Sequence, residues 1–286
     1  MALWDKIGST GNVEDRRGIG TGGIALTGVG GLVVFLLFAF MGGGTGENGS
    51  VLEQILGQAT NQQTSQTSEQ AAEFQGADQY ETFTKKVLGS NNDIWQDIFA
   101  VQGVEYTAPK LVLFRQLTQS ACGAASSTVG PHYCPYDQTI YLDETFFDEL
   151  QQRFGGSSGD VAQAYVISHE VGHHVQNLTG TMEQVQSEQQ ENPGAANDLS
   201  VKLELQADCY AGVWARSISQ LGVFENDQEI KEALSAAAAV GDDHVQETIQ
   251  GRSSPETWTH GSSEQRVKWF TTGYDTGKAA ACNTFE

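Results

Sequence analysis

An uninterrupted run of uncharged, mostly apolar residues near the start of the chain constrains the fold more than any other feature. It covers residues 24–41 and reads IALTGVGGLVVFLLFAFM. A helix of this length would extend about 27 Å, close to the thickness of the hydrocarbon core of a bilayer. A buried helix of a water-soluble core is the alternative, but the Gly-rich sequence beside the run offers it nothing to pack on. We therefore expect one transmembrane helix at 24–41.

A cleaved signal peptide is the stronger alternative for this run. The sequence GGG at 42–44 does not resemble the A-x-A pattern of a cleavage site, which favours an uncleaved anchor. Lys6, Arg16 and Arg17 precede the run, and the next basic residue is Lys85. By the positive-inside rule, we expect the N-terminus in the cytoplasm and the rest of the chain outside it.

The remaining sequence divides into three segments. Residues 1–23 are short, polar and Gly-rich, and we expect no stable structure there because almost nothing can be buried. Residues 42–78 are rich in Gly, Gln, Thr and Ser and predict a flexible linker. Residues 79–286 are long enough for one compact domain.

The pattern of apolar residues within 79–286 predicts a mostly helical α+β domain with a small sheet. Two β-type runs stand out, at 110–115 and 139–142, and Gly-, Ser- and Pro-rich segments separate the elements. Helices are expected near 79–88, 92–102, 144–154, 160–178, 198–220, 227–248 and 262–273.

The charge of the chain excludes some classes of partner. Its 15 Lys+Arg against 36 Asp+Glu give a formal net charge of −21. Binding to nucleic acid needs a basic surface, and so does docking on anionic lipid headgroups. We therefore expect no nucleic-acid partner, whereas 39% hydrophobic residues suit a globular protein.

The motif His169-Glu170-Val-Gly-His173 is the most informative sequence in the chain. On a helix, residues four apart project from one face, so both imidazoles can bind one Zn²⁺. Glu170 would lie beside the metal, where it can accept a proton from a water molecule. Asp160 is a plausible N-cap of this helix. The alternative is a surface glutamate between two histidines without a metal.

A second pair of acidic residues lies downstream, where Glu204 and Asp208 are also four apart on an expected helix. One carboxylate can complete a His₂Glu site, and the other can accept the free N–H of a zinc-bound histidine. A solvated acidic stripe is the alternative, but the neighbouring residues are largely apolar, and a buried carboxylate needs a partner.

Four further histidines have weaker signals. His174 follows His173 directly and cannot share a helical face with His169, so we expect packing or support of the site. His132 and His244 are expected in ordinary loop or helix positions. His260 precedes an expected helix and can donate a hydrogen bond to a developing oxyanion, although spacing alone slightly favours an ordinary role.

These motifs together resemble the neutral zinc metallopeptidase family of bacterial membrane-anchored proteins. The resemblance includes HEVGHH, ELQADCYAG and HGSSEQRVKWF, and it extends to NVEDRRG at 12–18 and to residues 122–150. The order HExxH…ExxxD is also similar to that of gluzincin peptidases.

The resemblance implies a zincin-like domain on the outer side of the bacterial inner membrane, with one Zn²⁺ per chain and a peptide or protein substrate. It implies His169, His173 and Glu204 as ligands, Glu170 as the base, and Asp208 as the partner of a zinc histidine. Two other functions remain open at this stage. One is a non-catalytic envelope protein with structural zinc, and the other is a hydrolase of a non-peptide amide such as peptidoglycan.

All four cysteines follow the apolar run, and an extracytoplasmic compartment favours disulfides. We expect the pairs Cys122–Cys134 and Cys209–Cys282; four free thiols and a cysteine–zinc site are the alternatives.

The segment 139–142 is either an ordinary core strand or an exposed edge strand to which an extended peptide could add.

Overall fold

The computed structural model describes residues 2–18, 78–127, 129–224 and 226–286. The apolar run at 24–41 and the expected linker, apart from residue 78, lie outside these ranges. Among the described residues, no helix is both long enough and apolar enough to cross a membrane.

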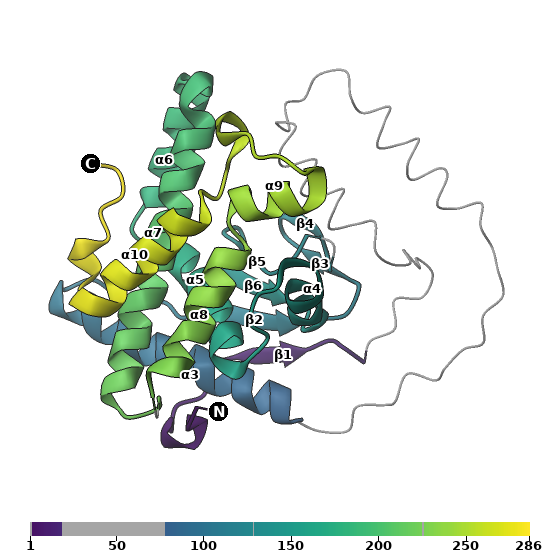
Figure 1. Ribbon diagram of the computed structural model, residues 1–286. Coiled ribbons are helices and arrows are strands. Elements are labelled where there is room, and N and C mark those ends of the chain that lie inside the picture. The colour runs from purple at the N-terminus through teal and green to yellow at the C-terminus, as the bar shows by residue number, and fades with distance from the viewer. Residues whose placement is uncertain (1, 19–77, 128, 225) are drawn as a thin grey trace.

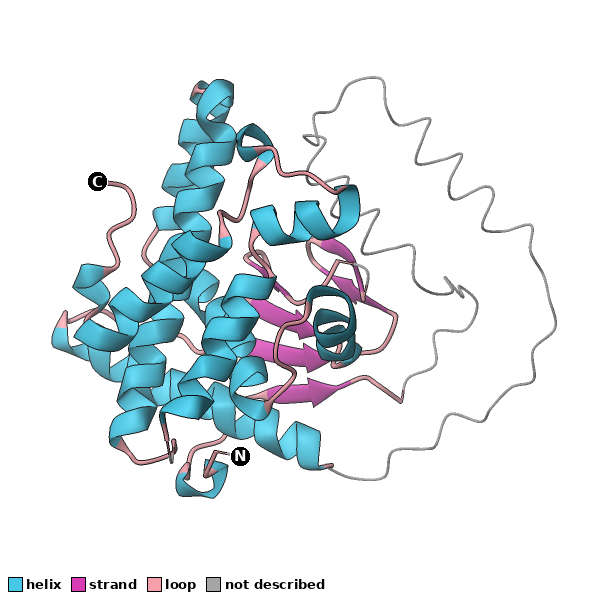
Figure 2. Ribbon diagram, in the orientation of Figure 1, coloured by secondary structure: helices cyan, strands magenta, loops and turns pink. Residues whose placement is uncertain are grey.

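A mixed four-stranded sheet has the strand order β1-β2-β6-β5. Strands β1, β2 and β6 run parallel, whereas β5 is antiparallel to β6. A separate hairpin pairs β3 with β4. Figure 2 shows the strands on one side of the molecule and most helices on the other. The strands are β1 (Val13–Asp15), β2 (Lys110–Leu113), β3 (Leu117–Ser120), β4 (Gly123–Ser126), β5 (His132–Cys134) and β6 (Thr139–Leu142).

Helices make up most of the described chain, which confirms the mostly helical α+β prediction (Figure 1). Short 3₁₀ turns include η1 (Trp4–Lys6), η2 (Pro193–Ala195), η3 (Pro255–Thr257) and η4 (Ala279–Ala281). The α-helices are α3 (Gln79–Val101), α4 (Thr145–Phe154), α5 (Asp160–Leu178), α6 (Thr181–Glu191), α7 (Ala196–Gln220), α8 (Asp227–Ala239), α9 (Asp242–Gln250) and α10 (Ser263–Thr276).

Several predicted elements need correction. The two helices expected within 79–102 form the single helix α3, and the helix expected at 227–248 divides into α8 and α9. The division falls at Gly241, where a Cβ atom would lie 2.3 Å from the backbone nitrogen of Ser263. The helix α6 and four of the strands were not predicted. The segment Thr139–Leu142 is the interior strand β6, fully buried, so the edge-strand hypothesis is wrong.

The helix that carries the HExxH motif, α5, lies in the core, and its first half is almost fully buried, as its apolar sequence predicts. It packs against α7, the helix of the ExxxD pair, and Gly172 permits the approach. A Cβ atom there would lie 3.0 Å from the Cα of Ala207. The two motifs therefore face each other across one helix–helix contact.

The expectation that residues 1–23 lack stable structure is wrong for the described residues 2–18. Trp4 and Ile7 are buried in the core, and β1 adds a strand to the sheet beside β2. Asp160, expected as an N-cap, is instead the first residue of α5, and its carboxylate accepts hydrogen bonds from the backbone of Ala2 and the indole of Trp4.

Both expected disulfides are present, Cys122–Cys134 and Cys209–Cys282, and together they use all four cysteines. The first joins Cys122, the residue before β4, to Cys134, the last residue of β5. The second joins the C-terminal segment to the middle of α7, one residue beyond Asp208.

Candidate metal centre

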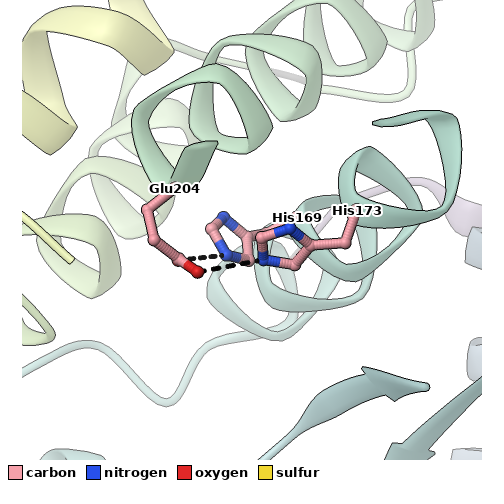
Figure 3. Close-up of side chains that lie close together, drawn as sticks. All are labelled: His169, His173 and Glu204. Atoms are coloured by element: carbon pink, nitrogen blue, oxygen red, sulfur yellow. Dashed lines mark hydrogen bonds and ion pairs between the residues drawn. The ribbon is translucent and has the colours of Figure 1, made fainter. Parts of the chain in front are cut away.

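Three side chains from two helices converge at one point, as Figure 3 shows. His169 and His173 come from α5 and Glu204 from α7, and one ligand atom of each lies within 4.8 Å of the others. The Nε2 of His169 is 3.1 Å from Glu204 Oε2, and the Nε2 of His173 is 3.3 Å from Glu204 Oε1. Two imidazole nitrogens and one carboxylate are the donor set of a catalytic zinc site with one open position.

The opposite nitrogen of each imidazole has its own buried acceptor. His169 Nδ1 lies 2.9 Å from Asp208 Oδ1, and His173 Nδ1 lies 2.9 Å from Gln176 Oε1. With the proton on Nδ1, the Nε2 lone pair is free to bind a metal. The contact between Asp208 and His169 is the geometry that the family resemblance implied for Asp208. Gln176 was not predicted; its spacing of three residues from His173 was the available signal.

Asp208 is the centre of a fully buried network. Arg266 of α10 donates from Nε to Asp208 Oδ2 at 2.9 Å, and the hydroxyl of Tyr165 donates to Asp208 Oδ1. Arg266 also donates to the hydroxyl of Tyr165. Since a buried carboxylate needs compensation, this network keeps Asp208 charged and its orientation toward His169 fixed. Arg266 and Tyr165 were not recognised from the sequence because their contact to Asp208 is long-range.

The electrostatics of the site favour a cation. Burial by itself lowers the pKa of His169, but Asp208 and Glu204 outweigh it and raise that pKa to about 10. Burial raises the pKa of Glu204, yet the two imidazoles hold it well below its usual range. The carboxylates therefore hold positive charge at the point where a divalent metal would bind in place of protons.

Glu170 is buried beside these ligands and faces the same cavity. Its Oε2 has no hydrogen-bond partner among the described residues. A buried carboxylate oxygen without a protein partner is costly unless a ligand or water binds it. The position fits a base beside a metal-bound substrate site, and zinc fits the donor set.

His260 lines the same cavity from the loop before α10. Its Nδ1 lies 3.3 Å from Asp242 Oδ1, at the start of α9. The other oxygen of Asp242 accepts three backbone N–H groups, from Thr259, His260 and Gly261, at 2.6–2.9 Å. Asp242 therefore fixes both the loop and the imidazole. The sequence did not single out Asp242.

The remaining histidines lie outside the group of three ligands. His174 is fully buried, with its ring nitrogens bonded to the carbonyl of Thr107 and the hydroxyl of Tyr133. His244 contacts the carbonyl of Phe154. His132 lines the cavity, and its ring stacks on that of Tyr141.

The ligands open into a cavity of about 400 Å³ with mostly apolar walls. Residues from α4, α5, α6 and α9 contribute to it, together with the segment that leads into β5. The apolar lining residues are Val129, Pro131, Phe146, Leu150, Phe154, Val166, Met182, Leu203, Val240 and Val245. An apolar cavity with a few convergent polar groups is typical of a binding site for an apolar group.

Comparison with known proteins gives a consistent result. Residues 2–285 match the family described as "Putative neutral zinc metallopeptidase". The uncharacterized protein YpfJ of Escherichia coli K12 is 42% identical over 290 residues, which cover 99% of this chain and 98% of YpfJ. The uncharacterized protein Rv2575 of Mycobacterium tuberculosis H37Rv is 47% identical over 222 residues, 73% of each chain. No solved structure matches.

Proposed function

The chain belongs to the neutral zinc metallopeptidase family, and from this premise we propose that it hydrolyses peptide bonds at the His169–His173–Glu204 centre. The observation that carries the proposal is the convergence of these three ligands beside the buried Glu170, which faces the cavity. A structural zinc site needs no base and no open position, whereas catalysis needs both.

Each residue at the centre has a distinct role in this reaction. His169, His173 and Glu204 would hold a zinc ion, which would supply polarisation of the scissile carbonyl and a lowered pKa for a water molecule. Glu170 accepts a proton from the attacking water and later delivers it to the leaving amine. His260, fixed by Asp242, donates a hydrogen bond to the oxyanion that develops on the carbonyl oxygen.

The cavity indicates which substrates fit. Its walls beside the centre are mostly apolar, and the charged side chains that line it are the three ligands, Glu170 and the residues that support the ligands and His260. A peptide with a large apolar side chain next to the scissile bond could bury that side chain in this cavity. Burial contributes about 25 cal/mol of favourable free energy for each Å² of apolar surface removed from water. His132 and Tyr133 of the edge strand β5 line the same cavity. An extended substrate could therefore form backbone hydrogen bonds with β5.

The two disulfides support a compartment outside the cytoplasm, because disulfides persist where the environment is oxidising. Association with the bacterial inner membrane through residues 24–41 rests on the sequence alone.

The deciding experiment compares the full chain with its Glu170→Gln variant on a peptide library. Glutamine can hydrogen-bond water but cannot accept its proton, so cleavage should fall about 10²–10⁴-fold at unchanged zinc content. Glu188→Gln is the matched control, since Glu188 is exposed on α6. Equal cleavage by Glu170→Gln at equal zinc occupancy would contradict the mechanism.

A further inference from the structure

Residues 2–18 are built into the same body as the metal centre. Strand β1 pairs in parallel with β2, with Leu111 donating to the carbonyl of Asn12 and Arg16 donating to the carbonyl of Leu113. At the other end of the segment, the backbone N–H of Leu3 donates to Val223. Backbone hydrogen bonds therefore join this segment both to the sheet and to the chain after α7.

The N-terminal segment crosses helix α3, and glycine residues stand where the two backbones come closest. The segment passes over α3 at Gly89, where a Cβ atom would lie 2.7 Å from the backbone nitrogen of Thr10. Gly11 has the reciprocal constraint, because its Cβ would lie 2.5 Å from the side chain of Leu88. Glycine in the middle of a helix is destabilising relative to alanine. Here it permits the close approach that Figure 1 shows between the purple segment and α3.

The two ends of the intervening sequence meet at an ion-pair cluster. The side chain of Arg17 is 2% exposed, and its Nη2 lies 2.6 Å from Asp15 and 3.0 Å from Asp78. Asp78 is also the N-cap of α3, accepting from the backbone of Glu81 at 2.7 Å. Asp78 therefore lies within hydrogen-bond distance of Arg17, although the two residues are 61 positions apart in the sequence.

We propose that residues 2–18 and 78–286 lie on the same side of the membrane, as one folded body. A sheet cannot be completed through a bilayer, because its backbone groups would have to pair across the hydrocarbon core. The contacts of residues 2–18 with the sheet and with the chain after α7 therefore require one compartment for both parts.

This placement differs from the opposite sides that the positive-inside rule predicts for the two flanks of the apolar run. The positive-inside rule predicts the orientation of a membrane helix when the segments on its two sides are free to lie in different compartments. Here Lys6 donates to the carbonyl of Gly222, and Arg16 donates to the hydroxyl of Thr118 and to the carbonyl of Gln119. Both cations therefore belong to the folded body. The inference does not depend on peptidase activity.

Single cysteines introduced into the full chain test the placement. Thr10 and Glu264 are exposed residues at opposite ends of the sequence, and all four native cysteines are in disulfides, so each introduced thiol is the only free one. Right-side-out and inside-out membrane vesicles are treated with a membrane-impermeant maleimide, with the wild-type chain as background. Thr10→Cys and Glu264→Cys should react in the same class of vesicle and stay at background in the other.

Reaction of the two variants in opposite classes of vesicle would overturn the proposal. Zinc content equal to that of the wild type, measured on each purified variant, excludes misfolding as the cause of reactivity. A second pair of variants tests the docking itself. Gly89→Ala should make residues 2–18 sensitive to limited proteolysis, whereas Gly8→Ala, with nothing within 4 Å of its Cβ position, should not. Equal resistance of Gly89→Ala and the wild type would contradict the crossing of α3.

Discussion

At the scale of single residues, the centre depends on the atoms that hold each imidazole. Asp208 orients His169 and Gln176 orients His173, and both acceptors are fully buried. Gln176 is itself fixed, because its amide donates to the carbonyl of Leu203 and to the side chain of Gln206. The ligands are therefore held by α7 as well as by their own helix.

Removing either acceptor should weaken zinc binding. We expect Asp208→Asn and Gln176→Met each to lower zinc affinity about 10–100-fold, because the imidazole loses its fixed tautomer and orientation. Competition with a chromophoric chelator measures the affinity. Gln163→Met is the control, since that side chain, also on α5, donates a hydrogen bond to the carbonyl of Ser158 and not to a histidine of the group. Unchanged affinity in Gln176→Met would show that His173 is oriented by other groups.

At the scale of elements, α7 and α10 cross at paired glycines. A Cβ atom on Gly273 would lie 1.9 Å from the carbonyl oxygen of Cys209, and one on Gly212 would lie 2.1 Å from that of Phe270. This crossing brings Arg266 of α10 to Asp208 of α7. The close packing of two helices thus completes the support of the metal centre.

Gly273→Ala should therefore destabilise the protein. The added methyl group meets backbone atoms that cannot rotate away, and overpacking of this kind costs about 1–3 kcal/mol or more in the free energy of unfolding. Urea denaturation followed by circular dichroism measures the change. Gly194→Ala serves for comparison, because nothing lies within 4 Å of its Cβ position. Equal stability of the two variants would contradict the described crossing.

At the scale of the whole molecule, the Arg17 cluster joins the N-terminal segment to the rest. Burial alone would raise the pKa of Asp78, but the hydrogen bond and charge of Arg17 outweigh it and hold the pKa below its ordinary 3.8. Because the folded-state pKa is depressed, the stabilisation is present above about pH 4 and is lost as the pH falls through the folded-state value.

The variant Asp78→Asn tests this pH dependence, because asparagine keeps the N-cap of α3 but removes the charge. At neutral pH the wild type should be the more stable of the two. The difference in free energy of unfolding should close as the pH falls below about 4. Urea denaturation across this range is the measurement. A difference that persists in acid would mean that the charge of Asp78 is not its source.

The Cys209–Cys282 disulfide should contribute more to stability than its counterpart. Its partners are 73 residues apart, against 12 for Cys122–Cys134. The loop-entropy model gives about 4 kcal/mol for the longer loop and about 3 kcal/mol for the shorter. Thermal unfolding of the two double Cys→Ser variants measures both contributions. A larger loss in the variant without Cys122 and Cys134 would contradict the ranking.

The sequence by itself determined the donor residues and the local elements of the candidate centre. The spacing of His169 and His173 depends only on the helical repeat, and the bounds predicted for their helix, 160–178, agree with α5. The same repeat grouped Glu204 with Asp208, and the family resemblance assigned their separate roles. The two disulfide pairs were also predicted.

Tertiary structure decided the rest, because the contacts concerned join residues far apart in the chain. Arg266 meets Asp208 only where α10 crosses α7. A polar, Gly-rich start of the chain gives no local sign of burial, yet a strand at the edge of a sheet needs only backbone partners, and β2 supplies them to β1. The spacing of apolar residues along the sequence indicates which face of a helix or strand is buried. It does not indicate which other element packs on that face.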